Sequence, residues 1–213
     1  FFLMIVGIIY VEQGQRRIPI QFAKRVRGRK VMGGQSTYIP LKVNSAGVIP
    51  VIFATSVLFF PALIATSLPQ DNSITAGIRN WIDVNLANSQ GTSWFYIFFL
   101  GMLIIFFTYF YTTIQFDPVR QSDMIRRQGG FVPGVRPGIS TTNYLSHIIS
   151  RITLPGSVFL ASVAVLPSIA SAIWDIPLGF SGISILITVG VALETMKQIE
   201  SQLSMRNYEG FID

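Results

Sequence analysis

The residues of this chain that could carry chemistry are few, and most of them are basic. The 213 residues include 16 Lys and Arg against 10 Asp and Glu, with one His and no Cys. The lack of Cys excludes a thiolate nucleophile and a thiolate metal site, and one His cannot form a His-cluster metal centre. No Walker A sequence is present, so the chain is not expected to hydrolyse ATP. We therefore predict no enzymatic activity, no cofactor and no bound metal.

The acidic residues do not suggest a catalytic pair. Asp117 and Asp123 fall in a polar segment, but nothing near them favours the carboxylate pair of an acid–base enzyme. His147 stands beside two apolar residues and fits a loop or interface position better than a general base. Glu194 lies within an apolar stretch, where an acid is a functional candidate. Its place near the end of that stretch instead favours a helix-end pairing with Lys197.

The strongest signal is a concentration of positive charge in segment 12–42, whose one acid is Glu12. This segment holds eight of the 16 basic residues: Arg16, Arg17, Lys24, Arg25, Arg27, Arg29, Lys30 and Lys42. A second basic segment, 115–151, carries Arg120, Arg126, Arg127, Arg136 and Arg151. Such charge could bind anionic lipid headgroups, ribosomal RNA or an acidic protein partner.

Long apolar segments position these basic stretches. Half of the residues are hydrophobic and 12% are charged, whereas soluble domains carry about 25% charged residues. We predict transmembrane helices over 43–68, 94–114, 152–173 and 183–198. The first eleven residues, 1–11, are apolar but too few to span a bilayer, and they fit the cut end of a longer helix. The predicted fold class is an all-α polytopic membrane protein with five transmembrane helices, the first of them truncated.

The connections between these helices set the orientation of the chain. They cover 12–42, 69–93, 115–151 and 174–182, followed by a tail over 199–213. Their Lys and Arg residues number eight, one, five and none, with two more from Lys197 onward. Because basic loops stay on the cytoplasmic side, the first and third connections and the C-terminus are predicted to be cytoplasmic.

The two basic segments have local patterns of their own. Alternation of Ile18, Ile20 and Phe22 predicts a projecting hairpin that turns near Gly28. The centre of the second segment, RRQGGFVPGVRPG, is rich in Gly and Pro and predicts a shaped loop with its arginines exposed at the tip. In the external connection, apolar residues at helical spacing around Trp81 predict an amphipathic helix along the membrane interface.

The segment 43–68 combines prolines with small and polar residues. Pro50 and Pro61 are predicted to lie inside the helix and to kink it. Ser45, Val48, Ile52 and Thr55 follow helical spacing and would share one face. That face could serve ordinary helix packing, since small and polar residues mediate contacts between membrane helices.

Three stretches of the sequence resemble the SecY family, the channel subunits of the Sec protein translocase. A cytoplasmic loop and the seventh helix of that family are matched by RRIPIQFAKRV and GGQSTYIPLKVNSAGVIPVIFATS. The next cytoplasmic loop and the ninth helix are matched by GGFVPGVRPGISTTNYL and RITLPGSVFLA. The tenth helix and tail are matched by VALETMKQIESQLSMRNYEGF. The resemblance covers nearly the whole chain and implies helices six to ten, although the family's FGGTS pattern reads FSGIS here.

The resemblance implies one half of a clamshell channel in the bacterial plasma membrane. This channel would pass unfolded secretory polypeptides across the membrane and membrane proteins laterally into it. Ile52 and Ile187 match a ring of apolar side chains at the waist of the pore, and such a ring excludes hydrated ions by dewetting. Asn44 and Ser56 match polar positions of the lateral gate.

The resemblance also implies partners. A SecA ATPase motor or a ribosome would dock on the two cytoplasmic loops. The docking residues would be Lys24, Arg25, Arg27, Arg29, Lys30, Arg126, Arg127 and Arg136. The other implied partners are SecE, SecG, the signal peptide, the translocating polypeptide, membrane lipids and the N-terminal half of the same protein.

Two other functions explain part of the sequence. A secondary transporter would account for several spans and for helices broken by proline. It requires an intramembrane ion pair or proton relay, for which Glu194 is the available acid. A nucleic-acid-binding membrane anchor would account for the basic segment 12–42 but not for the Ser, Asn and Pro residues of 43–68.

Overall fold

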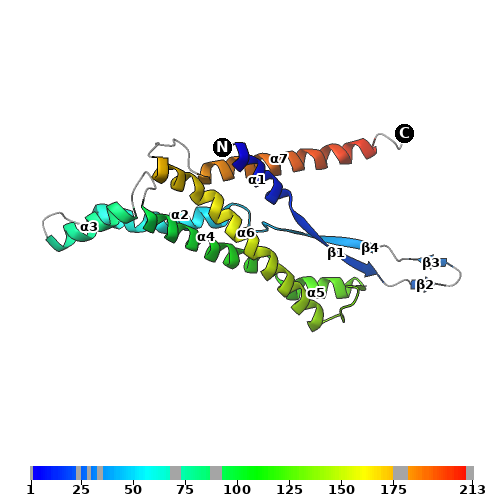
Figure 1. The fold of residues 1–213 in the computed structure, drawn as a ribbon. Helices are drawn as coiled ribbons and strands as arrows, with labels where there is room; N and C mark the ends of the chain where they lie inside the picture. The colour runs from blue at the N-terminus through cyan, green and yellow to red at the C-terminus, as the bar shows by residue number, and fades with distance from the viewer. Residues whose placement is uncertain are drawn as a thin grey trace.

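Helices dominate the chain and form an elongated bundle, with strands projecting at one end and α3 at the other (Figure 1). The computed structural model describes residues 2–22, 25–27, 30–32, 36–67, 73–86, 93–174 and 182–209. The helices are α1 (Phe2–Gln13), α2 (Ile49–Ser67), α3 (Ser73–Asn85), α4 (Trp94–Gln115), α5 (Pro118–Arg127), α6 (Ile139–Trp174) and α7 (Gly182–Glu209). The strands are β1 (Gln15–Phe22), β2 (Arg25–Arg27), β3 (Lys30–Met32), β4 (Ser36–Lys42) and β5 (Gly130–Phe131).

Four of the described helical stretches are long and apolar enough to cross a membrane. They are Ile49–Ser67, Trp94–Arg127, Ile139–Ile173 and Gly182–Ser204, while the apolar α1 is shorter. Residues 43–48 form turns, so α2 begins at Ile49. Pro50 therefore lies in the first turn of α2, where its missing N–H removes no helical hydrogen bond. The predicted interior position of Pro50 is wrong, and Pro61 is the proline inside this helix.

The helices α1, α2, α4, α7 and the later part of α6 share one apolar core, and we call this unit the membrane body. The fully buried side chains at its centre include Ile8, Val51, Leu100, Ile104, Leu160 and Leu186. The start of α7 lies very close to α6, because a Cβ added to Gly182 would fall 2.4 Å from the carbonyl oxygen of Val163. Close approach of helix backbones at small residues is the usual way in which membrane helices pack.

The projecting strands form two antiparallel ladders in line. β1 pairs with β4 from Gln15 opposite Lys42 to Gln21 opposite Ser36. Further out, β2 pairs with β3, and Arg27 lies opposite Lys30. The predicted hairpin is therefore present, although Gly28 itself lies outside the described residues. The described part of the fold is therefore mostly helical, and it has two small sheets in addition to the predicted helices.

A second apolar core lies beside the membrane body. It is built by β1, β4, β5, α5 and the first part of α6, and we call this unit the platform. Its buried residues are Ile18, Ile20, Leu41, Ile125, Val132, Leu145 and Ile148. α6 has 36 residues, about 54 Å at 1.5 Å per residue, against a hydrocarbon core of about 30 Å. This one helix therefore belongs to both units and connects them.

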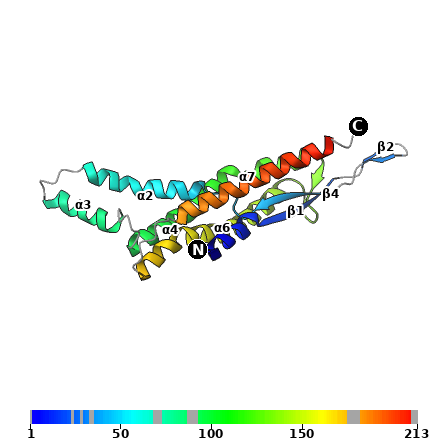
Figure 2. The ribbon, with the colours of Figure 1, turned by 90° about the horizontal axis from the view of Figure 1, so that it is seen from above.

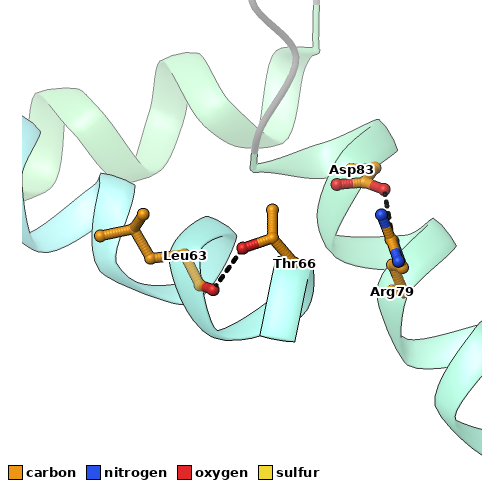
Figure 3. Close-up of polar contacts among 4 residues, drawn as sticks. All are labelled: Leu63, Thr66, Arg79 and Asp83. Carbon is orange, nitrogen blue, oxygen red and sulfur yellow. Dashed lines mark hydrogen bonds and ion pairs between the residues drawn. The ribbon is translucent and has the colours of Figure 1, made fainter. Parts of the chain in front are cut away.

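The predicted amphipathic helix is present as α3 at the opposite end of the bundle. The ring of Trp81 meets Phe95 of α4 edge-on, with ring centroids 5.6 Å apart. On α3, Arg79 Nε lies 3.8 Å from Asp83 Oδ2, close to the last turn of α2, where Thr66 Oγ1 donates to the Leu63 carbonyl (Figure 3). α3 extends the bundle beyond α2 and α4 (Figure 2).

Candidate functional site

The two basic segments, predicted as separate loops, are joined in the platform. The strand order is β4-β1-β5, and β5 from the second segment pairs with β1 through Gln21 opposite Phe131. The junction is tight: a Cβ added to Gly130 would fall 3.0 Å from Ile20 Cγ2 and 3.2 Å from Ile125 Cγ2. Strand pairing and apolar packing together therefore hold the two segments in a fixed relation.

α5 presents two of the predicted docking residues. Asp117 caps its N-terminus, since its Oδ1 accepts hydrogen bonds from the backbone N–H groups of Val119 at 2.9 Å and Arg120 at 3.4 Å. Asp117 thus has a structural role. Arg126 and Arg127 occupy the last turn, where positive charge is favoured by the helix dipole, and both side chains are exposed.

Arg136 lies in the turn between α5 and α6, and its side chain is exposed. Gly134 and Gly138 on either side have φ of +82° and +113°, a region that favours glycine. Thr141 Oγ1 donates to the Arg136 carbonyl at 2.9 Å, and Ser122 Oγ donates to the Gly138 carbonyl at 3.2 Å. This turn is therefore anchored to both α6 and α5. The predicted exposure of Arg126, Arg127 and Arg136 is confirmed, but Arg126 and Arg127 lie on α5 and not at the tip of a loop as predicted.

Three of the remaining predicted docking residues lie on the outer strands β2 and β3. Arg25 and Arg27 lie on β2, and Lys30 lies on β3. Lys24 and Arg29 lie outside the described residues. The strands β2 and β3 lie farther from the membrane body than β1 and β4 (Figure 1).

The two predicted pore residues lie on α2 and α7. Ile52 is 43% exposed, and Ile187 is half-buried. α7 approaches the turn that precedes α2, where a Cβ added to Gly190 would fall 3.4 Å from Val48 Cγ1. The helices α2 and α7 run in opposite directions (Figure 2). Ile52 is one turn after Val48, and Ile187 is about one turn before Gly190, so both lie on the same side of this approach.

The two predicted gate residues have different environments. Asn44 is 5% exposed, and its Nδ2 donates to Glu12 Oε2 at 2.9 Å. Ser56 is exposed and its Oγ donates to the Ile52 carbonyl of its own helix at 2.8 Å. Sequence reasoning missed Glu12, although its position as the one acid of segment 12–42 was a signal.

The acid and metal expectations can be compared with the described part of the chain. Glu194 and Lys197 are both exposed and form no ion pair there, so their predicted pairing is wrong. The ion pair found among the described residues, Arg79–Asp83, lies on α3 and not in a candidate span. The described residues also hold no group of three His, Asp or Glu able to bind a metal. An intramembrane ion pair for a secondary transporter is not found in this part, and that alternative is not favoured.

Four helices of membrane-spanning length and composition, joined to a basic platform, define a multi-pass membrane protein. The sequence model of the SecY family, described as SecY, matches residues 1–196. The chain therefore belongs to the SecY family.

Relatives and solved structures agree with this membership. The protein translocase subunit SecY of Streptomyces scabiei is 51% identical over 216 residues, covering 99% of this chain and 47% of the relative. That of Mycobacterium bovis is 50% identical over 218 residues, covering 99% and 48%. The chain spans about half the length of the curated relatives it matches.

Two solved structures share the fold. One, described as the structure of a protein conducting channel, has a TM-score of 0.60 at 17% identity, covering 94% of this chain and 47% of that one. The other concerns the plug domain of SecY and the closed state of the translocation channel. Its TM-score is 0.55 at 16% identity, and the match covers 94% of this chain and 48% of that one.

Proposed function

We propose that this chain forms one half of a protein-conducting channel. The whole channel passes unfolded secretory polypeptides across the membrane and releases membrane proteins laterally into it. The observation that carries this proposal is the match of the SecY family along residues 1–196. The curated relatives are named protein translocase subunits, and each is about twice as long as this chain. The other half of the channel would come from the N-terminal half of such a protein.

The platform would be the docking site for the SecA motor or a translating ribosome. Its exposed arginines 126, 127 and 136 stand on anchored elements, and the hairpin adds Arg25, Arg27 and Lys30. Positive charge attracts carboxylates and phosphates over several ångströms, and arginine binds both groups through two parallel hydrogen bonds. The platform and the C-terminus would then be cytoplasmic, in line with the bias of basic residues. SecE and SecG would bind outside the channel.

The pore would pass along α2 and α7. Ile52 and Ile187 would contribute to an apolar ring, which stays dry when closed and yields to many side chains because apolar contact has no direction. The exposed face of α2 around Ser56 would line the lateral gate with Asn44 near its entrance. Polar groups at such a gate are costly when they face lipid and stable when paired, so they bias a two-state opening.

The test is reconstitution of the chain, joined to the N-terminal half that its relatives carry, with SecE and SecG in proteoliposomes. With SecA and ATP, a precursor bearing a signal peptide should become protected from added protease. A precursor without the signal peptide is the control. Flux of a small solute coupled to an ion gradient, without protection of the precursor, would support a transporter and overturn the proposal.

A further inference from the structure

Glu12 and Asn44 join the two ends of the basic hairpin where they meet the membrane body. Asn44 Nδ2 donates to Glu12 Oε2 at 2.9 Å, between residues 32 apart in sequence. Glu12 lies in the last turn of α1, three residues before β1 begins, and Asn44 lies two residues after β4 ends. This side-chain contact therefore joins the chain just before β1 to the chain just after β4.

The backbone around this contact is fixed up to Val43. The Val43 N–H donates to the Gly14 carbonyl at 3.0 Å. α6 also passes close, since a Cβ added to Gly156 would fall 2.7 Å from the Val43 carbonyl oxygen. Residues 43–48 are turns that lead into α2, so the way in which Asn44 is held sets how α2 starts.

The bond to Glu12 compensates for the burial of the Asn44 amide. Asn44 is 5% exposed, and its Oδ1 has no hydrogen-bond donor among the described residues. A buried polar group without a partner is costly, whereas a hydrogen bond to a carboxylate is stronger than one between neutral groups. Without Glu12, neither Nδ2 nor Oδ1 of Asn44 would have a hydrogen-bond partner among the described residues, and burial of Asn44 would no longer be favoured.

We propose that Glu12 is a positioning residue for Asn44 and that their hydrogen bond couples the platform to the start of α2. β1 and β4 lead directly to the two sides of the bond, so a partner that tilts the hairpin moves Glu12 and Asn44 together. The start of α2 then follows the platform. The inference rests on the proposed function, in which docking on the platform opens a gate lined by α2. A chain without the Glu12–Asn44 hydrogen bond would still bind its partner, but α2 would not move when the partner binds.

The test measures docking and the response of α2 separately in the reconstituted full-length channel. Because this chain has no Cys, Ser56→Cys can report on α2 through its rate of modification by a membrane-permeant thiol reagent, once any Cys of the N-terminal half is removed. SecA binding should change that rate in the otherwise unchanged channel. In Glu12→Ala, SecA affinity should stay within about twofold, and the SecA-dependent change should fall about tenfold, the scale of one hydrogen bond to a charged group.

Two further variants separate positioning from simple charge or stability effects. The exchange Glu12→Asn with Asn44→Glu rebuilds the amide–carboxylate pair in reverse, so it should restore the SecA-dependent change. Glu200→Gln removes an exposed carboxylate of α7 and should leave that change intact. The inference is overturned if Glu12→Ala retains the full response, or if its affinity and response fall in parallel while the exchange restores neither. Failure of the proposed function would instead appear as no precursor translocation before any residue is changed.

Discussion

The membrane body and the platform have similar interiors but opposite exteriors. Both cores consist mainly of Ile, Leu and Val, and the core of the membrane body also contains Ala. The membrane body exposes large apolar side chains such as Phe98 at 68% and Phe106 at 62%, whereas the platform exposes Arg126, Arg127 and Arg136. Lipid is as apolar as a core, so burial contributes little to helix association in the body. In the platform, the same burial removes apolar surface from water and stabilises the unit directly.

This difference predicts different responses to the same core truncation, and the largest effect is expected in the platform. Leu145 is fully buried there, and Leu160 is 2% exposed in the membrane body, both on α6. Leu145→Ala should lower the free energy of opening of the platform by about 2–5 kcal/mol, because transfer free energy is lost and a cavity is left. Leu160→Ala should lower the free energy of opening of the membrane body by less, because this side chain contacts lipid and not water when the helices separate. Amide hydrogen exchange in nanodiscs measures both, and a larger loss for Leu160→Ala would contradict the comparison.

The junction between the two basic segments should be the next most sensitive point. Gly130→Ala places a Cβ 3.0 to 3.2 Å from side-chain carbons of Ile20, Phe22 and Ile125, closer than ordinary contact, and such overpacking costs about 1–3 kcal/mol. Limited proteolysis should then cut the platform faster and leave the membrane body intact. Gly101→Ala in α4 is the matched control, because its Cβ would meet Val165 Cγ2 at an ordinary 4.0 Å. Equal protease resistance of the two variants would refute a tight junction.

The sequence predicted individual elements better than it predicted the contacts between distant segments. The alternation of Ile18 and Ile20 predicted the hairpin, because a half-buried strand has a period of two. The pairing of β1 with β5 was not predicted, since it joins residues 110 positions apart, such as Gln21 and Phe131, through a strand of two residues.

Two other features were not predicted, also for physical reasons. α6 begins at Ile139 because Leu145 and Ile148 pack in the platform, and a search for a fully apolar span cannot find that amphipathic part. Glu12 was missed because its hydrogen bond to Asn44 depends on the closure of the whole hairpin. Long-range contacts of this kind leave no period in the sequence.

The exposed charges of the platform should govern docking without affecting its folding. Arg126→Glu with Arg127→Glu reverses two exposed charges at the end of α5. Binding of SecA or ribosomes to the reconstituted channel should weaken by about tenfold or more at 50 mM salt, and the loss should shrink as salt screens the charges. Binding that is independent of salt, with or without the reversal, would contradict an electrostatic platform.

A substitution of Arg136 tests whether the planar shape of its guanidinium contributes to docking in addition to its charge. Arg136→Lys keeps the charge but loses the planar group that binds carboxylate or phosphate through two bonds, on a turn fixed by Gly134 and Gly138. Translocation should slow by about threefold to tenfold, since one of two hydrogen bonds is lost. A rate equal to that of the unchanged protein would reduce Arg136 to an orienting charge.

The smallest effect is expected in α3, at the end of the bundle opposite the strands. Arg79 and Asp83 form an i,i+4 pair on α3, with the side chains 29% and 48% exposed (Figure 3). Arg79→Ala should cost about 0.3–0.5 kcal/mol and leave SecA binding unchanged. Thermal unfolding and a binding titration measure both quantities. A loss of SecA binding comparable to that of the Arg126 and Arg127 reversal would contradict the assignment of docking to the platform.

The central claim is that α2 faces the polypeptide path at Ile52, and a crosslink tests it most directly. Ile52 and Phe59 are both exposed, at 43% and 62%, and seven residues place them two turns apart on nearly the same face. Ile52→Cys and Phe59→Cys would each carry a single thiol in this chain, which has no Cys of its own. With a polypeptide stalled in the reconstituted channel, Ile52→Cys should crosslink to it strongly and Phe59→Cys weakly. No crosslink from position 52, together with normal ion tightness in Ile52→Ser, would remove Ile52 from the pore.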